Sequence, residues 1–218
     1  MDNAEHSFEL LSAGDDGGLR GFLDEHPSAA DACDSTGISL LMHSLYRGRR
    51  DLAEVVAAKK SALDIFEASS LGRLDQLVVC LRDPSALNSR SKDGFTALHF
   101  ACYFGQAETV RVLLEKGAAP DAVASNPMQV MPLHSAASAR NAAAARLLLE
   151  HGAPVNARQQ SGYAPLHAAA QNGDLAMVEL LLQYGGDAKA ANDDGKTPAM
   201  IAREKGHEAI ALRMERAA

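Results

Sequence analysis

The sequence predicts an all-α protein in which about seven helix-turn-helix units stack as a solenoid. Three observations lead to this fold class. First, 41 of the 218 residues are alanine, whereas phenylalanine and tyrosine together number ten and tryptophan is absent. That composition suits closely packed helices around a thin core. Second, one segment of similar residue types recurs along the chain, and third, its clearest copies follow one another at a nearly constant spacing.

The first helix of each unit is marked by a short apolar segment with one anchor residue. Four copies are clear, beginning with Thr96-Ala97-Leu98-His99-Phe100-Ala101, and three fainter copies precede them. Most successive anchors are separated by about one repeat period of a helical solenoid. The step from Leu41 to Ile65 is clearly shorter, and the step from Leu98 to Leu133 is slightly longer. The anchors are Phe8, Leu41, Ile65, Leu98, Leu133, Leu166 and Ala199.

Each unit also carries residues that begin and end helices. Thr96 and Thr197 stand where a side-chain cap for a helix N-terminus is expected, and prolines occupy the next position in three units. A second apolar stretch follows the first helix, and in three units it ends at a glycine suited to the left-handed conformation. These glycines are Gly117, Gly152 and Gly185. We therefore expect two antiparallel helices and a turn in each unit.

These segments resemble the ankyrin repeat, whose signature is T-P-L-H-x-A followed by a leucine-rich second helix and a glycine turn. The resemblance covers nearly the whole chain and implies one ankyrin-repeat domain over residues 1–218 with short hairpin-like fingers between repeats. An N-terminal cap is expected over about residues 1–33. The repeats should span about 34–190, and a polar C-terminal capping repeat about 191–218.

Two steps depart from the usual repeat length. The short step shortens the unit around 57–65, where we expect helices to connect without a finger. The long step lengthens the finger at 123–131, which has Gln129 in place of the usual glycine and should be less regular. An alternative function, an enzyme or small-molecule sensor, would use a pocket at these two irregular segments.

The resemblance implies a non-catalytic adaptor or regulator that binds a partner protein on a concave face. Finger tips and the last residues of the first helices form that face in the family. Apolar and aromatic residues concentrate at these positions, as they do in protein interfaces. Alternatively, Phe95 and Phe104 fold over each other and cover the gap beside the missing finger. The candidate binding residues are Tyr46, Arg47, Leu71, Phe95, Tyr103, Phe104, Met128, Val130 and Tyr163.

A second patch, of positive charge, lies near the short unit. It could receive an acidic partner segment, or it could be a solvated face balanced by Asp51 and Glu54. Its residues are Arg47, Arg49, Arg50, Lys59 and Lys60.

No motif points to catalysis, a cofactor or a metal. In the ankyrin repeat the signature histidine fixes the finger, which implies that role for His99, His134 and His167. Stacked helices lie about 8–10 Å apart, so one zinc ion could not reach two of these side chains. We therefore expect no catalytic residue, no metal ligand and no cofactor.

Net charge and cysteine spacing indicate which partners and which cellular compartment to expect. The formal net charge of −7 argues against a nucleic-acid or membrane partner. Cys33, Cys80 and Cys102 have no paired spacing, which fits reduced thiols, and the first residues lack the pattern of a secretory signal. We expect a cytoplasmic protein that is monomeric alone and binds another protein.

Overall fold

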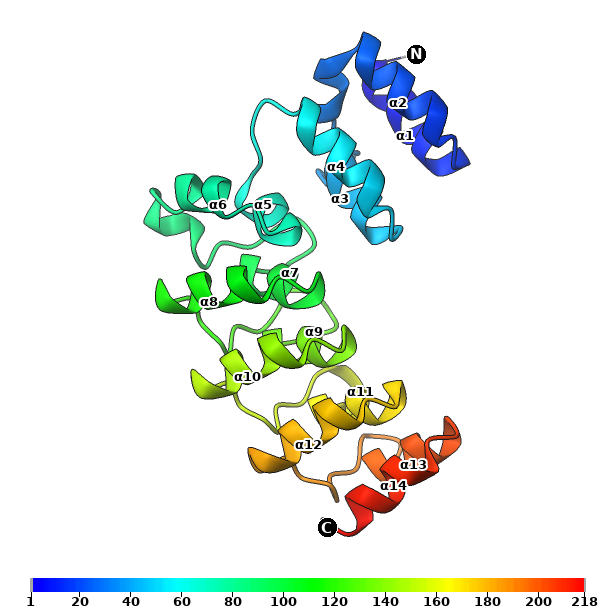
Figure 1. Ribbon diagram of the computed structural model, residues 1–218, viewed down its shortest axis with the longest axis vertical. Helices are drawn as coiled ribbons and strands as arrows, with labels where there is room; N and C mark the ends of the chain where they lie inside the picture. Colours follow the sequence, from blue (N-terminus) through cyan, green and yellow to red (C-terminus); the bar gives the residue numbers. More distant parts are fainter. Residues whose placement is uncertain (1, 218) are drawn as a thin grey trace. The chain divides into compact units, whose positions relative to one another are not determined.

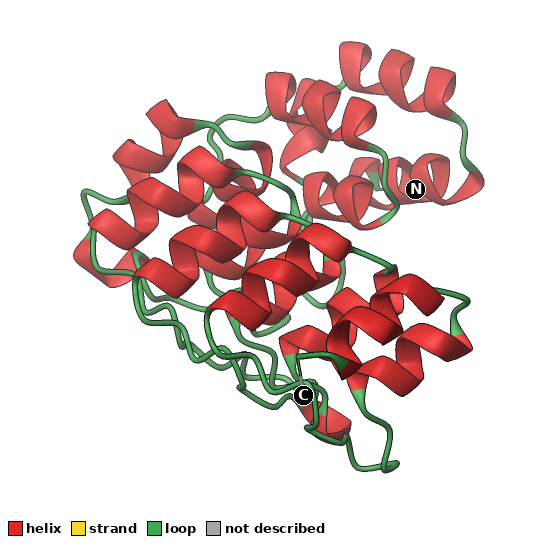
Figure 2. Cartoon of the chain, turned by 60° about the horizontal axis from the view of Figure 1, so that its bottom comes forward, coloured by secondary structure: helices red, strands yellow, loops and turns green. Residues whose placement is uncertain are grey.

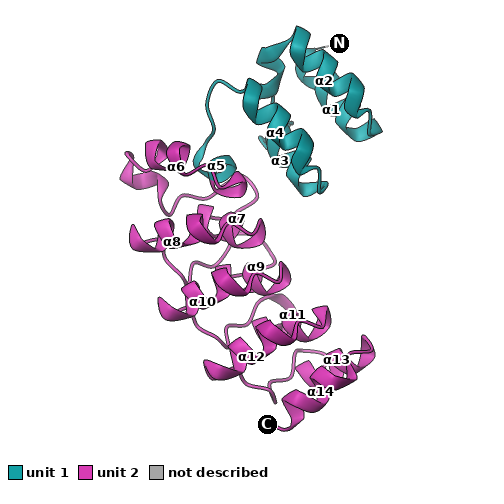
Figure 3. Cartoon of the chain, viewed as in Figure 1, with its two compact units in different colours: residues 1–68 teal, residues 69–218 magenta. Residues whose placement is uncertain are grey.

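The computed structural model describes residues 2–217 (Figure 1). Over these residues the chain forms fourteen α-helices and three 3₁₀ turns, with no β-strand (Figure 2). The packing divides the chain into two compact units, Met1–Ala68 (unit 1) and Ser69–Ala218 (unit 2) (Figure 3). The boundary falls close to the shortened repeat, and the expectation of one domain stays a prediction.

Unit 1 contains two helix pairs and the start of a third. Side-chain oxygens cap its helices: Asp15 accepts from the amide of Gly18 at 2.8 Å, and Ser39 accepts from that of Met42 at 3.2 Å. Its elements are α1 (Asn3–Ala13), α2 (Asp16–Glu25), a 3₁₀ turn (Pro27–Asp31), α3 (Leu40–Tyr46), α4 (Arg50–Lys59) and the first residues of α5 (Ile65–Leu71).

Unit 2 contains the rest of α5 and the remaining helices. Two further 3₁₀ turns, Pro84–Ala86 and Gln160–Gly162, lie in its connections. No helix in the described part of the chain has the length and apolar character needed to cross a membrane. The α-helices of unit 2 are α6 (Leu74–Cys80), α7 (Ala97–Tyr103), α8 (Ala107–Glu115), α9 (Pro132–Ser138), α10 (Ala142–Glu150), α11 (Pro165–Asn172), α12 (Leu175–Gln183), α13 (Pro198–Glu204) and α14 (Glu208–Glu215).

The helices of unit 2 from α7 onward stack in two rows. α7, α9, α11 and α13 pack one on the next, and α8, α10, α12 and α14 do the same beside them (Figure 1). Leu98, Leu133 and Leu166 hold like places in successive first helices, and each is at most 1% exposed. Full burial of one leucine contributes roughly 1.5–3 kcal/mol. The predicted solenoid of stacked helix pairs is thus confirmed.

A histidine connects the first helix of a repeat to the following finger. Nδ1 of His99 accepts a hydrogen bond from the backbone N–H of Thr96 at 3.2 Å, and Nε2 donates to the carbonyl of Val130 at 3.0 Å. His134 and His167 make equivalent bonds to their own helix starts and to the next fingers. The role that the resemblance implies for these histidines is confirmed.

The two threonine caps behave differently. The hydroxyl of Thr197 accepts from the amide of Met200 at 3.3 Å, as predicted. Thr96 occupies the N-cap position, as predicted, and its hydroxyl lies 2.8 Å from Nδ1 of His99. The hydroxyl can donate to this ring nitrogen, whereas a cap would require it to accept from a helix amide.

Side-chain amides tie the other ends of the first helices together. The amide nitrogen of Gln106 donates to the carbonyl of Ser70 at 3.1 Å, and that of Asn141 donates to Cys102 at 3.2 Å. Asn172 donates to Ser138 at 3.1 Å. Carbonyls in the last turn of a helix have no partner within the helix. Each repeat therefore satisfies the end of the repeat before it.

The long finger closes without a glycine. Gln129 takes the left-handed conformation, with φ of 51°, and the amide of Ala124 donates to the carbonyl of Val130 at 2.8 Å. The side-chain amide of Asn126 reaches back to the carbonyl of Asp93 at 2.8 Å. The expected longer and less regular finger is present, and it is held to the preceding one.

Candidate functional site

Most predicted binding residues belong to the row of first helices in unit 2 and to the fingers before them, which we call the inner-helix face. Tyr103, the last residue of α7, is 54% exposed, and Met128 in the long finger is 47% exposed. Large exposed side chains of this kind often anchor protein interfaces. These two residues are the most accessible apolar groups among those predicted for this face.

An aromatic cluster supports Tyr103. Phe100 is buried at its centre, with the ring centroids of Phe95 at 5.7 Å and Phe104 at 6.4 Å. Tyr103 meets Phe104 edge to face at 5.2 Å. Phe95 and Phe104 are half-buried. They therefore contribute to packing, as the alternative interpretation expected, although each packs on Phe100.

The other predicted residues divide by location. Leu71 is only 4% exposed, so the expectation that it lies open to a partner is wrong. Spacing placed it at a helix end but could not show which way its side chain turns. Val130 and Tyr163 are half-buried, and their carbonyls accept hydrogen bonds from His99 and His134.

Tyr46 and Arg47 belong to unit 1 and are not part of the inner-helix face. Tyr46 is 43% exposed. The guanidinium of Arg47 is exposed and donates to the hydroxyl of Ser12 at 3.2 Å. Both side chains are accessible, and their part in binding stays a prediction.

Arg140 is a residue of the inner-helix face that the sequence reasoning missed. It follows α9 at the place that Gly105 and Gly173 hold after α7 and α11. Its φ is 57°, against 80° and 68° for the two glycines. A non-glycine residue rarely adopts this conformation. The sequence signal that could have identified it is the absence of a glycine after α9, where the other repeats have one.

The histidines of the repeats are not available for chemistry. Burial lowers the pKa of His99 to about 4, and it also lowers the pKa values of His134 and His167. Each ring is neutral at neutral pH and uses one nitrogen as acceptor and the other as donor. Within residues 2–217, no group of three or more His, Cys, Asp or Glu side chains could hold a metal ion.

The basic patch of unit 1 is largely balanced by acids. Arg49 pairs with Asp16 and Asp51, and Arg50 lies 3.7 Å from Glu54. Lys59 lies 2.8 Å from Asp24. These contacts confirm a face balanced by acids for Arg49, Arg50 and Lys59, but not for Arg47.

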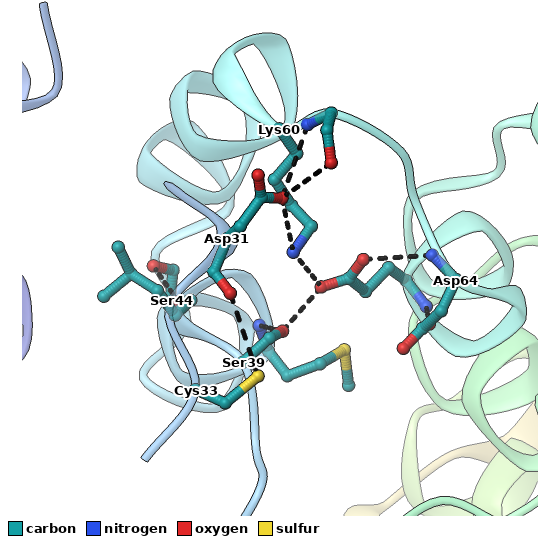
Figure 4. Close-up of polar contacts among 10 residues, drawn as sticks. Asp31, Cys33, Ser39, Ser44, Lys60 and Asp64 are labelled. Atoms are coloured by element: carbon teal, nitrogen blue, oxygen red, sulfur yellow. Dashed lines mark hydrogen bonds and ion pairs between the residues drawn. The ribbon is translucent and has the colours of Figure 1, made fainter. Parts of the chain in front are cut away.

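Lys60 differs, because it belongs to a partly buried ionic cluster (Figure 4). Its ammonium lies 3.3 Å from the carboxylate of Glu67 and 3.7 Å from that of Asp31, and only 8% of its side chain is exposed. Glu67 also accepts from the hydroxyl of Ser39 at 2.6 Å and from the amide of Asp64 at 3.1 Å. Burial and the charge of Asp64 raise the pKa of Glu67.

The cluster lies in the short repeat, where Glu67 takes the place of the histidine found in other repeats. Glu67 is the third residue of α5, the position of His99 in α7, and it binds the backbone amide three residues before it in the same way. In the shortened segment 57–65, Lys59 and Lys60 therefore pair with carboxylates that lie outside the segment. It lies in unit 1, whereas the long finger at 123–131 lies in unit 2.

Two sequence models of one repeat family match the chain. The family described as ankyrin repeats (3 copies) matches residues 65–159, and ankyrin repeats (many copies) matches residues 148–202. Together they cover most of unit 2 and reach the start of α5.

Curated relatives match about half of the chain. The human "DNA-binding protein RFXANK" is 36% identical over 117 residues, which are 52% of this chain and 45% of the relative. The human "CAP-Gly domain-containing linker protein 3" is 38% identical over 109 residues, 49% of this chain and 20% of the relative. The human "BCL-6 corepressor-like protein 1" is 35% identical over 96 residues, 44% of this chain and 5% of the relative. The chain thus spans less than half the length of these relatives.

Proposed function

Because the chain belongs to the ankyrin repeat family, we propose that it is a non-catalytic module that binds a partner protein through its inner-helix face. The observation that carries the proposal is Tyr103, which is 54% exposed on that face in a chain with only four tyrosines and no tryptophan. Tyrosine is enriched among the residues that dominate binding energy in protein interfaces.

The mechanism of such a module is rigid presentation. Hydrogen bonds from histidine rings join the fingers to the first helices. Hydrogen bonds from the side-chain amides of Gln and Asn join the ends of neighbouring first helices. A surface held in this way loses little conformational entropy when a partner binds. Phe104 packs against the ring of Tyr103 and itself stacks on Phe100, so the tyrosine side chain is positioned before binding.

Replacement of Tyr103 tests this function. We expect Tyr103→Ala to weaken capture of the partner from extracts of the native source by tenfold or more, while circular dichroism and the melting temperature stay near those of the wild type. The exposed ring contributes little to folding, with a change of about 0.5 kcal/mol or less. Phe104 is a poorer probe because it is half-buried against Phe100.

Tyr184→Ala is the matched control. Tyr184 follows α12, in the second row of helices, and is separate from the inner-helix face. Its removal should leave capture unchanged. Equal capture by wild-type protein and Tyr103→Ala would refute the proposed role of the inner-helix face.

The partner is proposed to be a protein, with the chain acting in the cytoplasm as a monomer until it binds. The name of one relative describes DNA binding. For this chain the net charge of −7 disfavours direct contact with a phosphate backbone. A DNA-binding assay at low and high salt separates the two partner classes, because direct binding to phosphates would weaken as salt rises.

A further inference from the structure

We propose that Arg140 forms, beside Tyr103, a binding position for a carboxylate in an acidic segment of the partner protein. The inference rests on the proposed function and names the chemistry of the partner at the same face. Three observations carry it: a strained backbone, an arginine without a carboxylate partner among the described residues, and an exposed aromatic ring on the adjacent helix end.

The backbone at Arg140 is unfavourable for arginine. Five other repeats close their first helix with a glycine of positive φ, between 68° and 80°, at Gly48, Gly72, Gly105, Gly173 and Gly206. Arg140 takes φ of 57° at the same place. A side chain in the left-handed region is disfavoured relative to glycine. Strain of this kind is found where a side chain is needed for function.

In the part of the chain that the structure describes, the guanidinium of Arg140 has no carboxylate partner, unlike those of some other exposed arginines in unit 2. Arg158 pairs with Asp193, and Arg213 pairs with Glu179. Over residues 2–217, no carboxylate lies within ion-pair distance of Arg140, and its hydrogen bond is to the carbonyl of Asn172. That bond orients the guanidinium and leaves donors for a ligand, since the group has five N–H donors.

Arg140 and Tyr103 belong to adjacent helix ends. The side-chain amide of Asn141, the residue after Arg140, donates to the carbonyl of Cys102, the residue before Tyr103, at 3.2 Å. A carboxylate on the guanidinium and an apolar side chain on the tyrosine ring would together suit an acidic segment that contains apolar residues.

The first test measures whether Arg140 stabilises the fold. Arg140→Gly and Arg140→Asn both relax the left-handed position, and an exposed guanidinium–carbonyl bond is largely replaced by water. We expect both variants to melt roughly 2–4 °C higher than the wild type. A lower melting temperature in both would show that Arg140 serves the fold, and it would overturn the proposal.

The second test measures the ligand chemistry. The 218-residue chain is used to select from a phage-displayed library of random peptides, and a selected peptide is then synthesised. We expect Asp or Glu next to Leu or an aromatic residue, and a loss of peptide affinity of about 10- to 100-fold in Arg140→Gly. Arg146→Ala, which removes an arginine from α10 in the second row of helices, is the control and should bind as the wild type does.

Three results would overturn the proposal: selected peptides without acidic enrichment, equal affinity in Arg140→Gly, or no selected peptide at all. The proposed function can still stand in those cases. Loss of partner capture by Tyr103→Ala together with normal capture by Arg140→Gly would keep the inner-helix face as the binding surface and remove only the carboxylate position.

Discussion

Three buried histidines join neighbouring repeats through both of their ring nitrogens. For His99, Nδ1 accepts from Thr96 and Nε2 donates to Val130 in the following finger. Such a ring must be neutral, because protonation would add a proton to the accepting nitrogen and place a charge in a buried site. The bonds that hold the fingers therefore depend on pH.

His99 should make stability fall in mild acid. Burial holds its pKa at about 4 in the folded protein, against 6.5 for an ordinary histidine. Between these values the unfolded chain binds more protons, so the free energy of unfolding decreases as pH falls. The contribution is complete above pH 6.5 and is lost by pH 4, at most about 3 kcal/mol. Urea unfolding of wild type and His99→Gln between pH 4 and 7 measures it.

The glutamine variant is a suitable comparison. A Gln at this position can still accept from the backbone of Thr96, but it does not titrate. We expect a flatter dependence of its unfolding free energy on pH. Parallel curves for the two proteins would contradict the assignment of a neutral, buried His99.

At the residue scale, sequence reasoning located positions better than it located side-chain directions. The spacing of the repeat placed His99, Tyr103 and Leu71 at the correct points of their helices. It could not separate the 54% exposure of Tyr103 from the 4% exposure of Leu71, because that difference depends on neighbours distant in sequence. The sequence did not single out Arg140, because its distinguishing feature is a left-handed backbone conformation that only the structure shows.

At the scale of the elements, the short connection between α4 and α5 shows what replaces a finger. Residues 60–64 join the two helices, and there Lys60 and Glu67 form a buried ion pair that the exposed Asp31 extends. The direct connection could be predicted from the short step between the anchors Leu41 and Ile65. The charged cluster could not, because Asp31 belongs to the 3₁₀ turn before α3 and only the fold brings it to Lys60.

Substitution of Lys60 and substitution of Glu67 should lower the unfolding free energy by different amounts. Lys60→Met leaves the carboxylate of Glu67 buried without its ammonium, and we expect a loss of about 3–5 kcal/mol in unfolding free energy. Glu67→Gln should be milder, since Lys60 keeps Asp31 at 3.7 Å and burial already disfavours the charged form of Glu67. Denaturant titration of both variants measures the difference.

The double variant Lys60→Met with Glu67→Gln completes the cycle. Removing the charge of Glu67 together with that of Lys60 should recover part of the stability lost in Lys60→Met. Additive losses in the double variant, or a greater loss in Glu67→Gln than in Lys60→Met, would show that the two groups do not act as a buried pair.

At the scale of the molecule, repetition made the fold predictable. Each helix pair has an apolar face that only a neighbouring pair can cover, so the spacing of Leu98, Leu133 and Leu166 was enough to predict the rows of unit 2. The resemblance to the ankyrin repeat was enough to predict which residues lie on the inner-helix face, because a finger and a first helix recur in the same order in each repeat. The division after residue 68 could not, because it depends on packing around the short step.

Amide hydrogen exchange of the 218-residue chain, with and without the partner captured in the Tyr103 experiment, tests most directly whether the inner-helix face binds. We predict slower exchange on binding at residues 103–106, 126–131 and 138–141, with little change in α8, α10 and α12. Slowing confined to those second helices, with the residues around Tyr103 and Arg140 unchanged, would contradict binding through the inner-helix face.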